Sequence, residues 1–419
     1  MTAVTDVGID RIQSRTVWVV SGAQVLGGVA VAGSVAAGSL LAAGVSGSEG
    51  MAGLAQTAGV AGAALLALPL ARIALSRGRR AALVTGYGIG AAGAVVVIAG
   101  AVTRSVALVL LGCLLVGVAS AAGYQARYAA TDLADEERRG RSLSLVVWAG
   151  TVGAILGPNL LQIAGSLGMA LSLPQLAGPY VVTFAALVGA SLILFLLLRP
   201  DPYRLSLVRQ SAAEGGTPVV APRLGAGLAH LRSNRGAMLG MTVVAVGHMV
   251  MVMVMVMTPI HMAHVDVTLQ LIGLVISVHV AGMYALAPVV GWAVDRWGRI
   301  PVVWAGLAIL IASCGLAGMA AGDDVPLLGL GLFLLGLGWS CTLIAGSTLL
   351  VDDASPADRP AVQGLSDLVM NVAGAVGGAL AGVVVMISSY SVLCVVAVVP
   401  VLALAVLTTR WGPHSRPPA

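Results

Sequence analysis

Residues 325–350 read VPLLGLGLFLLGLGWSCTLIAGSTLL, a run that contains no charged side chain. A membrane-spanning helix needs about 20 consecutive, mainly apolar residues, so this run alone is long enough to cross a bilayer. The rest of the chain has the same character, since 58% of its residues are hydrophobic and only 9% are charged. In a soluble domain about a quarter of the residues are charged. The composition therefore excludes a soluble globular protein and predicts an integral membrane protein.

Twelve apolar segments of this kind follow one another along the chain, separated by polar turns. A β-barrel is excluded, because its strands would be only about ten residues long with alternating polarity. We therefore expect an all-α integral membrane fold with twelve transmembrane helices. The predicted spans are residues 17–42, 51–74, 81–101, 105–126, 142–166, 178–198, 236–262, 268–292, 301–321, 325–350, 361–387 and 390–409.

The distribution of positive charge predicts the orientation of these spans. The 22 positively charged residues are all Arg. If the N-terminus is cytoplasmic, 21 of them fall in cytoplasmic segments, and only Arg104 lies in an external loop. An excess of Lys and Arg marks the cytoplasmic loops of membrane proteins. We therefore predict a multi-pass protein of the cytoplasmic (inner) membrane with both termini in the cytoplasm.

The longest polar stretch, residues 199–235, is rich in Pro, Gly and Arg and is typical of a linker. It divides the chain into an N-terminal six-helix bundle, 1–198, and a C-terminal six-helix bundle, 236–419. A shift of 221 residues aligns several features of the two halves, and a shift of 220 aligns Gly78-Arg79 with Gly298-Arg299. We therefore expect two pseudo-symmetric bundles with glycine-mediated helix packing, the plan of one large class of secondary transporters. The pairs aligned by 221 are Asp132 with Asp353, Arg138 with Arg359, Gly153 with Gly374, and Gly157 with Gly378.

A charged motif between the eighth and ninth spans makes a family resemblance specific. Residues 291–303 read GWAVDRWGRIPVV. This stretch resembles the loop signature G-x-x-x-D-R-x-G-R of the major facilitator superfamily, with the signature positions filled by Gly291, Asp295, Arg296, Gly298 and Arg299. The resemblance implies alternating access, in which two bundles rock around a midplane site. A carboxylate at this helix end could pair with neighbouring helix termini and latch a gate, whereas the Arg residues alone also fit simple positive-inside anchoring.

The first half departs from this signature. Its copy, ARIALSRGRR at residues 71–80, keeps Gly78, Arg79 and Arg80 but has Leu75 where the signature has Asp.

The seventh span carries an unusual run, GHMVMVMVMVMTPIHMAH at residues 247–264. Alternation with a period of two is typical of a strand, but an open strand in lipid would leave its backbone groups unpaired. The span must therefore be a helix, on which residues i and i+4 share a face. The run then forms two stripes, about 200° apart on a helix of 3.6 residues per turn. One stripe is Met249, Met253, Met257, His261 and His264, and the other is Met251 and Met255.

The eighth span carries His279 and Met283, again at i and i+4 and at a depth similar to that of Met251 and Met255. A His near the membrane midplane indicates a functional site. Thioether and imidazole ligands favour Cu(I), and both are neutral. The order M-x-x-x-M then H-x-x-x-M resembles the CcoA-like copper importers, a branch of the same superfamily. That resemblance implies Cu(I) import through Met251, Met255, His279 and Met283, with copper as the transported substrate and with no cofactor.

Several alternatives to the copper site stay open. Met side chains are flexible and suit promiscuous apolar surfaces, so the Met run could line a drug-efflux cavity. His248 is equally well explained as a second ligand or as a packed, hydrogen-bonding residue. His261 and His264 could capture metal at the outer end of the span, or be ordinary polar loop residues. The accessory metal candidates are therefore His248, Met249, Met253, Met257, His261 and His264.

A second transport hypothesis rests on Asp367 in the eleventh span. It lies within about two turns of the cytoplasmic helix end, where we expect partial solvation, and it could carry a proton or pair with a helix end. GTVGAILGP at residues 150–158 partly resembles the fifth-helix motif of antiporters, which favours efflux of amphiphilic drugs or metabolites, although close helix packing also explains it. A membrane sensor without transport activity is a third class.

Other functions are excluded by the motifs. The chain has no Lys and hence no G-x-x-x-x-G-K-[ST] loop, so we expect no ATP hydrolysis and no enzyme activity. The sequence GIGAAG at residues 88–93 matches a dinucleotide fingerprint but lies inside an apolar span, where the required strand and turn are missing. We expect the lipid bilayer and copper or a small molecule as partners, no nucleic acid, and a monomer.

Overall fold

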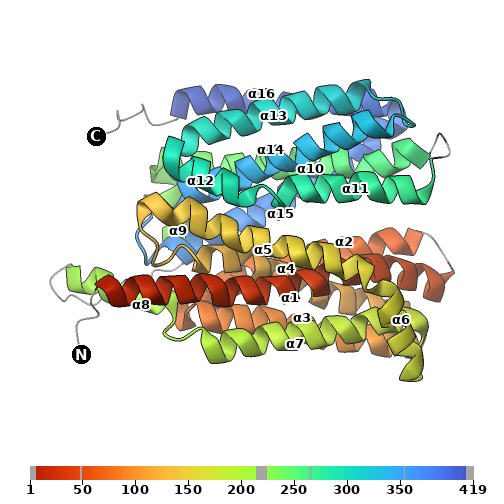
Figure 1. Cartoon of the computed structure of the whole chain (residues 1–419), viewed down its shortest axis with the longest axis horizontal. Coiled ribbons are helices and arrows are strands. Elements are labelled where there is room, and N and C mark those ends of the chain that lie inside the picture. Colours follow the sequence, from red (N-terminus) through yellow and green to blue (C-terminus); the bar gives the residue numbers. More distant parts are fainter. Residues whose placement is uncertain are drawn as a thin grey trace. The chain divides into compact units, whose positions relative to one another are not determined.

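The computed structural model of the chain is entirely helical in its regular elements, over the residues that it describes: 6–47, 50–213, 224–263, 265, 267–352 and 354–411. Within these residues, twelve helical segments are long and apolar enough to cross a membrane. The predicted all-α fold with twelve spans is therefore confirmed (Figure 1). The helices of the first half are α1 (Asp6–Ser46), α2 (Gly50–Arg77), α3 (Arg79–Val102), α4 (Val106–Ala129), α5 (Arg139–Asn159), α6 (Leu161–Ala170) and α7 (Gly178–Leu197), with short 3-10 turns at Glu136–Arg138 and Gln175–Ala177.

The second half repeats this series of helices. It contains α10 (Arg235–Ala263), α11 (Leu269–Tyr284), α12 (Ala287–Trp297), α13 (Arg299–Met319), α14 (Val325–Asp352), α15 (Arg359–Ile387) and α16 (Tyr390–Trp411). Between the halves lie α8 (Pro202–Ala213) and α9 (Leu224–Ser233), so the described part of the polar stretch 199–235 contains two helices.

Two predicted spans are each divided between two helices. The fifth is divided between α5 and α6, with Leu160 as the only non-helical residue between them. The eighth is interrupted after Tyr284 and continues as α12, which has a Pro in its first turn. Pro fits a first helical turn because the backbone N–H groups there have no acceptor within the helix. These breaks were not predicted from the apolar pattern, because apolar residues continue across both of them.

The chain forms two compact units, and neither is continuous in sequence. Unit 1 consists of residues 1–135, 145–224 and 356–368, and unit 2 consists of residues 136–144, 225–355 and 369–419. Helix α5 therefore begins in unit 2 and continues in unit 1, whereas α15 begins in unit 1 and continues in unit 2.

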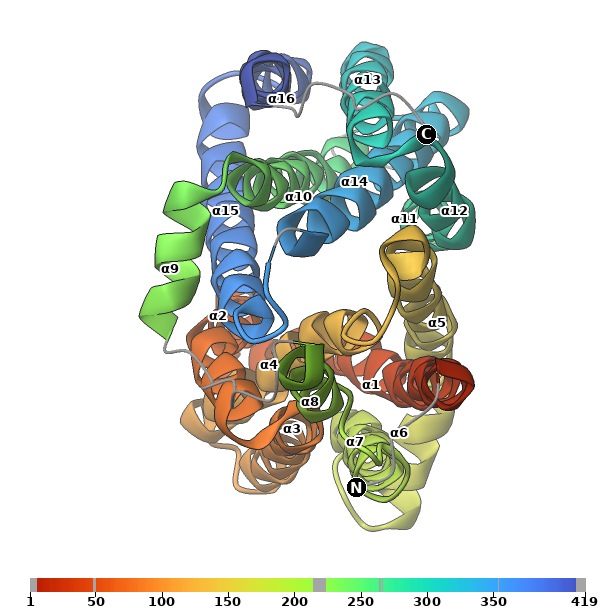
Figure 2. The same ribbon diagram turned by 90° about the vertical axis from the view of Figure 1, so that its left-hand side faces the viewer.

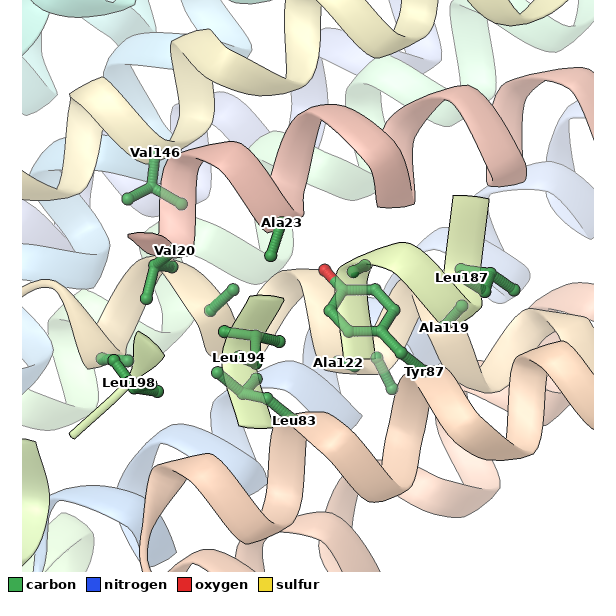
Figure 3. Close-up of a cluster of buried hydrophobic side chains, with 14 of the residues drawn as sticks. Val20, Ala23, Leu83, Tyr87, Ala119, Ala122, Val146, Leu187, Leu194 and Leu198 are labelled. Carbon is green, nitrogen blue, oxygen red and sulfur yellow. The ribbon is translucent and has the colours of Figure 1, made fainter. Parts of the chain in front are cut away.

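The core of unit 1 is built from small residues, with a few large side chains filling the remaining space. Figure 3 shows Tyr87 and Leu83 of α3 among Ala119 and Ala122 of α4, with Leu187 of α7 in the same cluster. In lipid there is little hydrophobic force between helices, so close backbone packing has to supply the attraction. The small side chains allow that approach.

The two halves have corresponding contacts, and these show the register of the repeat. Arg79 binds Asp132 with Nε and Oδ2 2.7 Å apart, and Arg299 binds Asp352 with the same two atoms 2.7 Å apart. Both pairs are separated by 53 residues, so the repeat has a shift of 220. The alignment of Asp132 with Asp353 by a shift of 221 is therefore wrong by one residue, because two adjacent Asp residues made the sequence ambiguous. Asp353 itself lies outside the described residues.

The glycines that precede α3 and α13 are also separated by 220 residues. Gly78 has φ 92° and ψ 172°, and Gly298 has φ 91° and ψ 166°. A positive φ of this size is costly for residues with a Cβ, so both turns need glycine. The alignment of these two turns predicted from the sequence is confirmed.

Glycine packing between helices also follows the shift of 220. A methyl group at Gly157 of α5 would lie 2.9 Å from the carbonyl O of Val29, and one at Gly377 of α15 would lie 2.7 Å from the carbonyl O of Met249. Gly377 is thus the counterpart of Gly157, in place of the predicted Gly378, where a methyl group would make only an ordinary contact at 3.5 Å with Val252.

The other two predicted packing glycines have different surroundings. A methyl group at Gly153 would lie 2.6 Å from Cα of Gly28, whereas one at Gly374 would meet the ring of His248 at 2.8 Å. Gly153 therefore allows two helix backbones to approach closely, and Gly374 makes room for a side chain.

Candidate functional site

The signature residues of the second half hold the start of α5. The carboxylate of Asp295, near the end of α12, accepts hydrogen bonds from the backbone N–H groups of Gly140 at 2.9 Å and Arg141 at 2.8 Å. The first N–H groups of a helix have no partner within it and carry partial positive charge, so a carboxylate is stabilised there. This is the pairing with a neighbouring helix terminus that the sequence predicts for Asp295.

The close approach of α12 to α5 depends on glycine on both sides. A methyl group at Gly140 would lie 2.7 Å from Oδ1 of Asp295, and one at Gly291 would lie 2.7 Å from the carbonyl O of Gly140. Gly291 of the signature is therefore needed for contact between the two backbones.

Arg299 of the signature belongs to a charge cluster in unit 2. Arg299 donates to Asp352 at 2.7 and 3.2 Å and to the carbonyl O of Glu136 at 2.8 Å. Arg139, the first residue of α5, donates to the same carboxylate at 3.1 Å. Arg296 is exposed. Asp352 thus holds α13 and α5 together at its end of α14.

Unit 1 contains the corresponding cluster, which is more deeply buried. Arg79 donates to Asp132 at 2.7 and 3.0 Å and also to Gln363 of α15. Arg359, the first residue of α15, donates to the carbonyl O of Asp132 at 3.3 Å. Arg139 and Arg359 are themselves separated by 220 residues. In each unit an Arg at the first position of a helix therefore contacts the corresponding Asp, through its carboxylate in unit 2 and through its backbone carbonyl in unit 1.

Asp367 lies further along α15 and is buried, with 1% of its surface exposed, so the expected partial solvation is wrong. Its Oδ1 accepts a hydrogen bond at 2.8 Å from Nη2 of Arg127, near the end of α4. Arg127 also donates to the hydroxyl of Tyr128 at 3.2 Å and lies over the rings of Tyr124 and Tyr128. Asp367 therefore belongs to an ion pair between a span of the first sequence half and one of the second.

The two Met stripes of α10 face different neighbours. Met249 and Met253 lie against Gly377 of α15, in the tight packing that repeats the contact of α1 with α5. Met251 and Met255 follow Gly247 at steps of four residues and so share its face, and Gly247 lies against Thr342 of α14. Met251 is buried, whereas Met255 and Met257 are partly exposed.

His279 lies at the interface of α11 with α14 and is 1% exposed. Its Nδ1 is 2.9 Å from the carbonyl O of Leu332, so Nδ1 carries the proton and donates. Among the residues that the structure describes, its Nε2 has no hydrogen-bond partner. Metal-ligating His residues commonly have one ring nitrogen fixed in this way by a carbonyl group. Met283, one turn further along α11, is also buried.

The Met pair of α10 and the His–Met pair of α11 reach similar levels of α14. Gly240 lies against Gly346, Gly247 against Thr342, and His279 binds Leu332. Since α10 runs antiparallel to α14, Met255 lies at about the level of Leu334, close to the level of His279.

One aromatic ring of α14 contacts both α10 and α11 (Figure 2 shows α14 between these two helices). Nε1 of Trp339, on α14, donates to Nδ1 of His248 on α10 at 3.2 Å, and the Trp339 ring packs edge-on against Tyr284 of α11 with centroids 5.7 Å apart. His248 is therefore a hydrogen-bonded residue in the packing between α10 and α14. Convergence of the four predicted copper ligands on one ion stays a prediction.

The C-terminal end of α10 is held by aromatic and backbone contacts. His261 stacks on Tyr390 with ring centroids 4.4 Å apart, and its Nε2 is 3.4 Å from the carbonyl O of Ala320. His264 lies outside the described residues. Among the residues that are described, no group of three or more His, Cys, Asp or Glu side chains could hold a metal ion.

Sequence reasoning missed Arg127, Trp339 and the ion-pair role of Arg79. Arg127 and Asp367 are 240 residues apart, and no local pattern marks such a pair. The Arg79–Asp132 pair did leave a signal, because its separation of 53 residues recurs in Arg299–Asp352.

These features define a class: a helical membrane protein built from two related halves, in which charged turns hold the starts of α5 and α15 in corresponding ways. The sequence model of the Major Facilitator Superfamily matches residues 17–266 and 241–419, and the chain belongs to this family. Its members are transporters, so the protein is a multi-pass membrane transporter and not an enzyme.

Three known proteins illustrate the relationship. The uncharacterized transporter YdeG of Bacillus subtilis is 38% identical over 386 residues, which cover 92% of this chain and 89% of YdeG. The riboflavin transporter RfnT of Brucella anthropi is 28% identical over 315 residues, covering 74% of this chain and 73% of RfnT. The human organic anion transporter MFSD10 has the same fold, with a TM-score of 0.72 at 19% identity over 94% of this chain and 99% of its own. None of these three names copper, so they support the superfamily but not the copper branch.

Proposed function

We propose that the chain is an alternating-access secondary transporter that moves a small organic solute and couples this movement to a proton carried by Asp367. The observation that carries the proposal is the ion pair between Arg127 and Asp367, whose side chains are 4% and 1% exposed. An ionisable pair buried in a membrane span is costly and is typical of proton and substrate pathways. The name of the relative RfnT supports an organic solute.

The coupling follows from what one proton would do to this pair. A proton on Asp367 removes its negative charge and leaves Arg127 with the Tyr128 hydroxyl and two ring faces. The charge-assisted hydrogen bond to α15 is then lost. One of the contacts that hold the first part of α15 in unit 1 is thereby removed, while the others remain. Proton binding would in this way favour a change of conformation.

The test uses the purified chain in liposomes that contain a pH-sensitive dye. A panel of heteroaromatic solutes, beginning with riboflavin, is applied as a concentration gradient, and solute and proton movements are measured together. The matched control is Asp323→Asn, the same chemical change at an exposed carboxylate. We expect wild type and Asp323→Asn to move protons with the solute, and Asp367→Asn to lose proton movement. An unchanged proton-to-solute ratio in Asp367→Asn would show that Asp367 is not the proton carrier.

Import of Cu(I) is a second candidate, favoured by one observation. Nδ1 of His279 is fixed by the carbonyl O of Leu332, Nε2 has no hydrogen-bond partner within the described part of the chain, and Met283 lies one turn away. A neutral imidazole held in this way is suited to a soft cation. Radiocopper uptake by cells tests it, with His230→Ala on α9 as the control. Normal uptake by His279→Ala at equal protein level rules copper out, whereas loss of uptake in that variant alone supports it.

We also propose that the protein is a monomer of the cytoplasmic membrane with both termini in the cytoplasm. The concentration of Arg in alternate loops supports this orientation. Single cysteines placed at Arg104 and Arg209 and treated with an impermeant thiol reagent on intact cells test it. Labelling at position 104 alone is expected, and labelling at position 209 alone would reverse the orientation.

A further inference from the structure

The two units differ in the contact that the end of one helix makes with the start of α5 or α15. In unit 2, Asp295 accepts hydrogen bonds from the N–H groups of Gly140 and Arg141 at the start of α5. With the shift of 220, the counterparts of these three residues in unit 1 are Leu75, Pro360 and Ala361. Leu75 and Ala361 do pack together, in a small buried apolar cluster with Tyr203. The position is therefore equivalent, but the polar contact is absent.

Pro360 explains why a carboxylate would not serve at position 75. Proline has no backbone N–H, so one of the two donors used by Asp295 in unit 2 is missing in unit 1. The other donor, the N–H of Ala361, already donates to the carbonyl O of Asp358 at 3.0 Å. An Asp at position 75 would be buried without the donors that its charge requires. The apolar side chain of Leu75 is therefore compatible with Pro360, whereas a carboxylate at position 75 would not be.

Helix α8 supplies the missing polar contacts. The hydroxyl of Tyr203, which is 1% exposed, donates to the carbonyl O of Ala357 at 3.0 Å, just before α15. The ring of the same residue lies below the guanidinium of Arg79, 5.9 Å from ring centroid to Cζ. Tyr203 therefore contacts Ala357 in the turn before α15, Leu75 at the position of the signature Asp, and the signature residue Arg79.

Asp201, two residues earlier, fixes α8 in place. Its Oδ2 accepts a hydrogen bond from the N–H of Arg80 at 2.8 Å, and its Oδ1 accepts one from the N–H of Arg204 at 3.2 Å. One carboxylate thus caps two helices, α3 and α8. A methyl group at Gly78 would lie 2.5 Å from the Asp201 carboxylate, so this glycine is needed for the approach as well as for its positive φ. At the corresponding Gly298 of unit 2, a methyl group would meet only a side-chain atom of Pro301 at 3.9 Å.

We propose that Asp201 and Tyr203 form a latch, in which the helix between the two halves of the chain replaces the missing signature carboxylate and holds the start of α15 in unit 1. Asp201 anchors the latch to the turn between α2 and α3, and Tyr203 makes the contact with α15. The latch makes docking of this part of α15 depend on α8. In unit 2 the corresponding contact to α5 is made within the signature itself.

The test is hydrogen–deuterium exchange of the full chain in lipid nanodiscs, followed by mass spectrometry of peptides from residues 359–368. The variants are Tyr203→Phe, which removes only the hydroxyl, and Asp201→Asn. The matched control is Tyr180→Phe, because Tyr180 is also buried in unit 1 and its hydroxyl also donates to a backbone carbonyl, that of Ser34, at 3.0 Å. A second control is Val208→Ala on the exposed side of α8.

Loss of one such hydrogen bond predicts about fivefold faster exchange in residues 359–368 of Tyr203→Phe. Asp201→Asn is expected to accelerate exchange both in these residues and in α8, since it releases the anchor. Both controls should leave residues 359–368 at the wild-type rate. Wild-type exchange of residues 359–368 in Tyr203→Phe overturns the latch, and so does equal acceleration in Tyr180→Phe, because the effect would then be a general loss of stability.

Discussion

Replacing one member of the Arg127–Asp367 pair should destabilise the protein much more than replacing both. The two side chains are 4% and 1% exposed and are joined by a 2.8 Å hydrogen bond. Arg127→Met leaves a buried carboxylate that has lost its cation, and Asp367→Leu leaves a buried guanidinium that has lost its anion. Breaking a buried pair in this way costs about 3–5 kcal/mol, whereas replacing the whole pair by apolar side chains of similar volume is often nearly neutral.

A double-mutant cycle measures this difference. Unfolding of wild type, both single variants and the double variant is followed in the same detergent, and the coupling energy is the departure from additivity. The control is Arg139→Met, because that residue is 11% exposed and its partner Asp352 keeps a second bond to Arg299 at 2.7 Å. Because Asp352 keeps this second ion pair, Arg139→Met should cost less than either single change at the buried pair. Additive effects of the two single changes, or single changes no larger than the control, would refute the interpretation of a buried, mutually dependent pair.

Three further predictions concern helix contacts and are measured as shifts of the thermal unfolding midpoint. Gly377→Ala should destabilise the protein by about 1–3 kcal/mol, since its methyl group would lie 2.7 Å from a carbonyl O of α10. The control Gly382→Ala, which has open space around it, should be nearly neutral. Equal effects of the two changes would contradict the packing argument. Asp295→Asn should cost about 1 kcal/mol at low salt through loss of a charge at a helix N-terminus, and less at high salt; an effect independent of salt would contradict this cause. Leu75→Asp should destabilise the protein, because the new carboxylate would be buried without hydrogen-bond donors. Adding Pro360→Gly should recover part of the lost stability by restoring a backbone N–H donor. No recovery would contradict the role given to Pro360.

The fold could be predicted from the sequence because the bilayer imposes strong and local rules. An uncharged run such as residues 325–350 has few structural alternatives in a membrane, and α14 spans Val325–Asp352 accordingly. The two stripes of Met residues followed from helical geometry in the same way, and their two faces contact α15 and α14. In both cases the decisive information lies within one helix.

The candidate site was less predictable, because its contacts join residues distant in the sequence. The partner of Asp367 lies 240 residues away, and the ring between α10 and α11 comes from a third helix, α14. The register error of one residue had a different cause. Adjacent Asp352 and Asp353 fit the repeat equally well by residue type, and the ion pair with Arg299 identifies Asp352 as the counterpart of Asp132.

The different contacts at the starts of α5 and α15 indicate that the two repeats have diverged in a coordinated way. In unit 2, Gly140 lets α12 approach closely, and its N–H gives Asp295 a partner. In unit 1, Pro360 removes that donor, so a charged residue at position 75 would lose its stabilisation, and an apolar contact takes its place. An apolar contact has no direction, and Tyr203 restores a directed hydrogen bond to the turn before α15. Each of these residues depends on its partners. Exchanging a single residue between the repeats should therefore destabilise the contact with the start of the helix, whereas exchanging the whole set should preserve it.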